Sequence, residues 1–254
     1  MKKLIPTIIA FLAAGAGTAT AQISIETDGT DAANLTKITV DGTEYTSFIG
    51  VDLTGFNMTS RGQTFQVQVD GVAAATGTDA SALMEDSSLT TAYAAMNSLS
   101  FDFQSSVVNR AGADLFIFET NLTEGGNTLN VTINGTQVNI GSSGNPFTSI
   151  GASVNYDLYL SETAATSVAQ LESIASWAFS KQNNGTAIGY AAIDLSDYGV
   201  ADGASISNLS MTGSGDYDIS GVVGLTQIPE PGTMALILGL AGFGIVTLRR
   251  RKLQ

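Results

Sequence analysis

Short runs in which apolar and polar residues alternate recur along this chain of 254 residues. Thr64–Val69, Thr128–Ile133 and Gln137–Ile140 are three such runs. Successive side chains of a β-strand point to opposite faces, so this period of two indicates strands with one buried face. Asn134-Gly135 separates the last two runs and predicts a two-residue hairpin, because both residue types tolerate positive φ.

A second hairpin is predicted at Asp41-Gly42, between Leu35–Val40 and Thr43–Val51. Many short strands with turn residues between them favour an all-β fold. We predict a β-sandwich, jelly-roll-like, with one or two short helices, and a barrel is the structural alternative. The remaining strand candidates are Ser100–Phe103, Asp114–Glu119, Val154–Leu160, Ala187–Leu195, Ser205–Met211 and Tyr217–Val223.

One segment departs from the alternation, and we predict a single amphipathic helix within Ser161–Lys181. Ser161 or Thr163 could cap it. A helix or a long loop is a further candidate over Ala80–Asn97. The apolar positions of the first helix follow helical spacing and are Val168, Leu171, Ile174 and Ala178, with Trp177 nearby.

The composition excludes several kinds of site. The chain has no Cys and no His, which removes disulfides, thiolate nucleophiles, His-based triads and the usual zinc sites. Residues 22–228 hold four Lys/Arg and 22 Asp/Glu, a net charge of −18. So acidic a body argues against nucleic acid and anionic lipid as partners.

The amino-terminal segment has the order of a secretory signal peptide. Lys2 and Lys3 are followed by the apolar run Leu4–Ala16. Ala19 and Ala21 then form a small-x-small cleavage pattern. We therefore expect export, cleavage by signal peptidase, and a mature chain that begins at Gln22.

The carboxyl-terminal segment has the order of a membrane stop. Pro229, Glu230 and Pro231 precede the charge-free run Gly232–Leu248. At 1.5 Å per residue its 17 residues span about 25 Å, at the short end for a bilayer core. We expect a transmembrane helix whose basic end stays in the cytoplasm. The basic residues that close it are Arg249, Arg250, Arg251 and Lys252.

This tail closely resembles the PEP-CTERM sorting signal of Gram-negative bacteria, in its Pro-Glu-Pro motif, apolar span and terminal Arg cluster. The resemblance implies recognition by an exosortase-type transpeptidase and delivery to the cell surface or extracellular matrix. It also implies an association with exopolysaccharide and biofilm. Before processing, the protein would be tethered transiently to the inner membrane. The expected organisation is a signal peptide over residues 1–21, an acidic β-sandwich over 22–225 and the sorting signal over 226–254.

Two segments of the body, Asn109–Glu119 and Ala192–Val200, resemble stretches of exported β-domains that carry this kind of tail. That resemblance implies a β-sandwich and no activity. We expect a structural or adhesive protein and no enzyme. The alternatives are a carbohydrate-binding module and a polysaccharide hydrolase with paired carboxylates. The candidate pairs are Asp114 with Glu119, Asp194 with Asp197, and Asp216 with Asp218.

No cofactor is expected, apart from a candidate structural calcium ion. Calcium prefers hard oxygen ligands such as carboxylates and backbone carbonyls. The two candidate clusters do not match the spacing of an EF-hand loop. Their carboxylates are Asp28, Asp31, Asp194 and Asp197.

Overall fold

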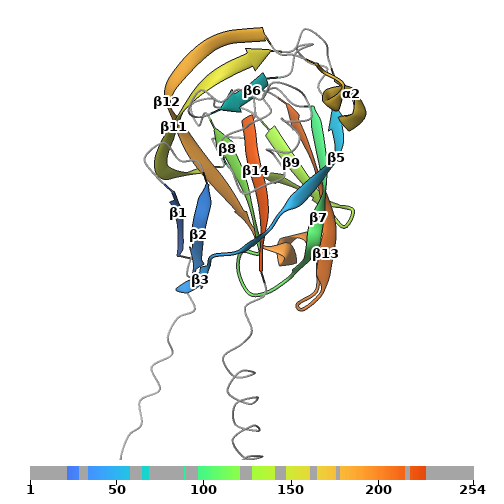
Figure 1. Cartoon of the computed structure of the whole chain (residues 1–254). Helices are drawn as coiled ribbons and strands as arrows, with labels where there is room; N and C mark the ends of the chain where they lie inside the picture. The colour runs from blue at the N-terminus through green and yellow to red at the C-terminus, as the bar shows by residue number, and fades with distance from the viewer. Residues whose placement is uncertain are drawn as a thin grey trace, which may run out of the picture.

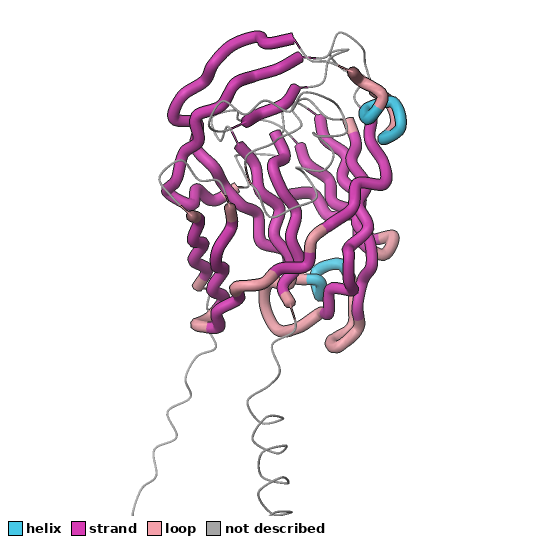
Figure 2. The backbone as a smooth tube through the Cα atoms, viewed as in Figure 1, coloured by secondary structure: helices cyan, strands magenta, loops and turns pink. Residues whose placement is uncertain are grey.

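The computed structural model describes ten stretches of the chain. They are residues 22–28, 34–57, 65–68, 89, 97–120, 128–140, 147–160, 165–175, 178–214 and 218–226. The described part is built from antiparallel sheets with two short helices (Figures 1 and 2). The predicted all-β class is therefore confirmed, and a jelly-roll strand order stays a prediction.

Two large sheets form the body of the fold. In spatial order, the five-stranded sheet contains β10 (Thr136–Ile140), β9 (Thr128–Ile133), β13 (Ser205–Ser214), β7 (Ser98–Val108) and β5 (Val51–Asn57). The six-stranded sheet contains β4 (Phe48–Ile49), β14 (Asp218–Leu225), β8 (Leu115–Thr120), β12 (Ala178–Ile193), β11 (Thr148–Leu160) and β6 (Phe65–Gln68). A smaller sheet contains β1 (Ile23–Thr27), β2 (Leu35–Val40) and β3 (Thr43–Tyr45).

The main hydrophobic core lies between the two large sheets. Leu99 and Phe101 of β7 are fully buried in the same cluster as Leu115 and Ile117 of β8. The alternation along β7 explains this arrangement, because its apolar side chains face inward and its polar ones face outward. The two sheets therefore pack as the layers of a sandwich.

A second core covers the other face of the six-stranded sheet. Phe116 and Phe118 of β8 are fully buried there, with Ile38 of β2. Every residue of β8 and of β14 is buried. These two strands therefore lie in the interior of a three-layer arrangement, with the small sheet as the outer layer.

Both predicted hairpins are confirmed, and their turns have the expected geometry. Asn134 and Gly135 have φ of 51° and 77°, and Asp41 and Gly42 have φ of 49° and 81°. Two successive residues with positive φ form the turn whose twist matches that of the flanking strands. One strand is predicted over Thr43–Val51, after the turn at Asp41-Gly42. The chain forms three short pieces there, β3, β4 and the start of β5.

The predicted helix over Ser161–Lys181 is wrong in its extent. The helix α2 covers only Val168–Glu172 and is capped by Ser167, whose Oγ accepts a hydrogen bond from Gln170 N at 3.2 Å. Residues from Ala178 onward belong to β12 and pair with β11. The sheet pairing thus overrides helical spacing in the second half of the segment. Ser161, Thr163 and Trp177 lie outside the described residues.

The structure describes only part of the other predicted segments. Of Ala80–Asn97, it describes Leu89, which is fully buried in the second core, and Asn97. A 3-10 helix, η1 (Leu195–Tyr198), follows β12. The described residues include no helix that is long and apolar enough to cross a membrane. The predicted signal peptide and membrane span lie outside the described residues.

The packing between the two large sheets can be tested where Gly224 of β14 lies against Val107 of β7. A Cβ placed on Gly224 would overlap Val107 Cγ2. Gly224→Ala is expected to lower the free energy of unfolding by about 2 kcal/mol through overpacking. Val107→Ala removes the obstacle, so the double variant should lose less than the sum of the two single losses. Urea denaturation measures all four chains, and additive losses would contradict this packing.

Candidate functional site

The last described residue of the chain, Thr226, is held on the body by hydrogen bonds. Arg110 Nη1 donates to Thr226 O at 3.1 Å, and Thr226 Oγ1 donates to Ser47 O at 3.0 Å. One residue earlier, Leu225 N donates to Asp114 O at 2.8 Å. The chain is therefore fixed in place up to the point where the sorting tail begins.

The carboxylate of Asp114 organises the loop that makes these contacts. It is 2% exposed. Its Oδ1 accepts from Arg110 N at 2.9 Å and its Oδ2 accepts from Leu195 N at 3.1 Å. Burial raises the pKa of Asp114 to about 6, with a further contribution from the charge of Asp194, although the two hydrogen bonds oppose the shift.

The two segments that resemble other exported β-domains meet at this place. Strand β8 of the first pairs with β12, which leads into the second. Asp114 N donates to Ile193 O at 2.8 Å, and Asn109 Nδ2 donates to Val200 O at 2.6 Å. The resemblance pointed to both segments, but nothing in the sequence indicates that they form one unit. We call the residues Ser47, Arg110, Asp114, Leu195 and Thr226 the tail-exit site.

The first described residue lies at the same end of the fold as the tail-exit site (Figure 1). Gln22 N donates to Asp41 Oδ1 at 2.9 Å, and Asp41 N donates back to Gln22 O at 3.0 Å. Gly112 lies beside this pair, since a Cβ built on it would be 3.8 Å from Asp41 Oδ2. Gln22 and Thr226, the first and last described residues, are therefore both held at this end of the fold.

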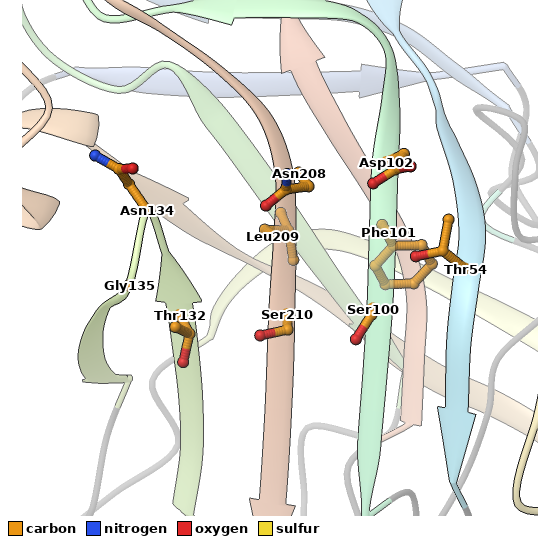
Figure 3. A pocket seen from close by; sticks show the side chains of 10 residues that line it. All are labelled: Thr54, Ser100, Phe101, Asp102, Thr132, Asn134, Gly135, Asn208, Leu209 and Ser210. Atoms are coloured by element: carbon orange, nitrogen blue, oxygen red, sulfur yellow. The ribbon is translucent and has the colours of Figure 1, made fainter.

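A polar groove on the outer face of the five-stranded sheet is a second candidate site. Its hollow measures about 240 Å³. Thr132, Ser210 and Ser100 lie in register across three strands, and Asn208 lies opposite Asp102 in a neighbouring row (Figure 3). Thr54, Asn134 and Gly135 complete the lining, with Phe101 and Leu209.

The groove offers hydroxyl, amide and carboxylate groups to a ligand. Its one aromatic residue, Phe101, is fully buried and belongs to the core. Asp102 also lies opposite Asp52 of β5, whose Oδ1 accepts from Gln104 Nε2 at 3.2 Å. The groove therefore suits a ligand that is rich in hydroxyl groups and carries no negative charge.

Two of the candidate calcium ligands, Asp28 and Asp194, accept local hydrogen bonds. Asp28 binds Asn34 through both carboxylate oxygens, at 2.7 Å and 2.9 Å, and these bonds lower its pKa. Asp194 caps η1 by accepting from Ser196 N at 2.8 Å. Asp197 lies within η1, and Asp31 is outside the described residues. The part of the chain that the structure describes holds no cluster of three acidic side chains suited to a metal.

One carboxylate pair considered for hydrolysis, Asp114 with Glu119, is not brought together. Asp114 directly precedes β8 and Glu119 lies near its other end, roughly 16 Å away at the rise of a strand. Paired carboxylates of glycosidases lie about 5 to 9.5 Å apart. Asp218 begins β14, and Asp216 lies outside the described residues.

The residues of the predicted processing sites lie outside the described residues, with the exception of Gln22. They are Ala19, Ala21, Pro229, Glu230, Pro231, Arg249, Arg250 and Arg251. Sequence reasoning found these residues because they form linear motifs. It missed Arg110, Asp41 and the groove, because their partners are distant in the sequence and come together only in the fold.

Comparison with protein families identifies the tail. A family model described as the PEP-CTERM protein-sorting motif matches residues 227–252. The match begins at the residue after Thr226. Comparison with curated proteins and with solved structures found no match to this chain. The predicted sorting signal is thereby confirmed.

The raised pKa of Asp114 predicts how stability changes with pH. The pKa is about 6 in the folded protein and 3.8 ordinarily, so the folded state binds more protons between these values. The free energy of unfolding should therefore fall as pH rises from 4 to 6, by up to about 3 kcal/mol from this group. Asp114→Asn should remove that contribution. Urea denaturation of both chains at several pH values gives the difference, and parallel curves would contradict the assignment.

Proposed function

We propose that this chain, which carries the PEP-CTERM protein-sorting motif, is an exported structural or adhesive protein of the cell surface or extracellular matrix. The motif supports an exosortase-sorted exported protein with a membrane-anchoring tail. The finer role, a contribution to an exopolysaccharide matrix or biofilm, is our proposal. Export through a cleaved signal peptide and a transient inner-membrane tether belong to the same proposal.

The observation that carries the proposal is the position of the sorting motif relative to the fold. Thr226, the last described residue, is hydrogen-bonded to Arg110 and Ser47, and the match to the motif begins at the next residue. A folded acidic body with a removable tail can be released intact when the tail is cut. Its net charge of −18 over residues 22–228 favours a soluble state outside the cell.

We propose that the body acts without catalysis, as a binding or packing unit. Asp114 and Glu119 are too far apart for the paired-carboxylate mechanism. A structural calcium ion at Asp28 or Asp194 stays part of the proposal, and it would have to compete with the local hydrogen bonds that both carboxylates accept.

Glu230→Ala tests the sorting role in the native host. Pulse-chase labelling and intact mass should show the full-length precursor accumulating in the membrane. For the parent chain, a product that ends near Pro229–Pro231 should appear at the surface or in the medium. Glu172→Ala, in the exposed helix α2, is the matched control and should be processed like the parent chain. Normal release of the Glu230→Ala chain would contradict the proposal.

The polar groove favours a second candidate function, the binding of a neutral polysaccharide. Asp102 and Asn208 lie opposite each other and could bind vicinal hydroxyl groups of one sugar. A groove without an exposed aromatic ring would bind each sugar weakly, so affinity would depend on many copies acting on one polymer.

Affinity electrophoresis tests this candidate with exopolysaccharide purified from the native host. The parent body should be retarded in gels that contain the polymer. The double variant Asp102→Asn and Asn208→Ala should lose most of the retardation. Ser24→Ala, exposed on β1 of the small sheet and not on the five-stranded sheet, is the control and should migrate like the parent. Equal retardation of all three chains would exclude the groove as the binding site.

A further inference from the structure

We infer that the face of the body around the tail-exit site contacts the membrane-embedded enzyme that cuts the tail, and so takes part in its recognition. We call this surface the exit face and define it by Asp41, Ser47, Arg110, Ala111, Gly112 and Thr226. The inference rests on the proposed function, because it assigns to the sorting enzyme a contact beyond the linear motif.

The first argument is the length of chain that separates the body from the motif. Only Gln227 and Ile228 lie between Thr226 and Pro229. Fully extended, three residue steps reach about 10 Å. An enzyme whose active site holds Pro229–Pro231 therefore comes within one or two side-chain lengths of the exit face.

The second argument is that the chain is fixed up to Thr226. Arg110 holds its carbonyl, Ser47 holds its hydroxyl, and Leu225 is bound within β14. A long linker would let the body move away from the enzyme, whereas here only Gln227 and Ile228 separate the fixed residue Thr226 from the motif. The distance between the exit face and the active site is therefore limited while the motif is bound.

The predicted membrane boundary leads to the same conclusion. The apolar span begins at Gly232, six residues after Thr226. Six extended residues reach roughly 20 Å. The part of an enzyme that protrudes from the membrane has to fit into this space, so it is bounded on one side by the exit face.

The hydrogen bonds of the exit face connect both ends of the mature body. Gln22 is bound to Asp41, Gly112 lies beside Asp41, and Arg110 donates a hydrogen bond to Thr226. The first and the last described residue are thus both bound by residues of the exit face. Ala111 is exposed and lies between Arg110 and Gly112 in the chain, which makes it a suitable position for a test.

The experiment measures the rate at which the tail is cut in the native host, by pulse-chase labelling of full-length chains. Ala111→Glu places a long charged side chain on the exit face and should slow cutting at least fivefold. Ala175→Glu is the matched control, because Ala175 is also exposed but follows α2, at the other end of the fold (Figure 1). This control should be cut at the parent rate.

A second variant separates the contact from any effect on folding. A spacer of six Gly and Ser residues, inserted after Thr226, leaves the body unchanged but releases the exit face from the enzyme. It should also slow cutting at least fivefold. Ala111→Glu in the spacer chain should then add little, because the contact that it disrupts is already lost. Thermal unfolding of each released body confirms that it is folded.

The outcomes distinguish the inference from the proposed function. Glu230→Ala serves as the reference in which cutting should fail, and normal cutting there would overturn the proposed function itself. If Glu230→Ala blocks cutting while the spacer and Ala111→Glu chains are cut at the parent rate, only the exit-face contact is overturned. Faster cutting of the spacer chain would also overturn it, since the body would then be an obstacle. If the exit face contacts only lipid, Ala111→Glu will leave the rate of cutting unchanged, which would also overturn the inference.

Discussion

Burial of the six-stranded sheet on both faces is the constraint on which the rest of this structure depends. The chain has no cysteine, so no disulfide restricts its unfolded state. Its stability must come from apolar area removed from water. In β8, Leu115 and Ile117 face one core while Phe116 and Phe118 face the other. One short strand thus contributes to two cores, which the small sheet makes possible by covering the outer face.

This constraint connects the core to the sorting tail. Strand β14 is also buried along its whole length and is the last described strand. It pairs with β8, so the end of the chain is fixed to a strand that lies about a hundred residues earlier in the sequence. Such long-range pairing forms only when most of the chain is available. In the folded body the last described strand is in place and Thr226 is bound to Arg110, directly before the residues that match the sorting motif.

The features that the sequence predicted are those that depend on neighbouring residues. Asn134-Gly135 and Asp41-Gly42 form the expected turns because positive φ is a property of the turn residues themselves. The helix over Ser161–Lys181 failed for the opposite reason. Val168–Glu172 has a local cap and is helical, but the residues from Ala178 onward pair with β11. Spacing alone could not reveal that a partner strand was available.

The candidate sites show the same difference between features that depend on neighbouring residues and features that depend on distant ones. The sorting motif is linear, so its residues could be identified without a structure, and the family comparison agrees with them. The tail-exit site is not linear, because Arg110 and Thr226 are 116 residues apart in the sequence. The resemblance of Asn109–Glu119 and Ala192–Val200 to other exported β-domains indicated two important segments but gave no reason for them. Their hydrogen bonds through Asp114 supply a physical reason, since together they hold the end of the body against which the tail is presented.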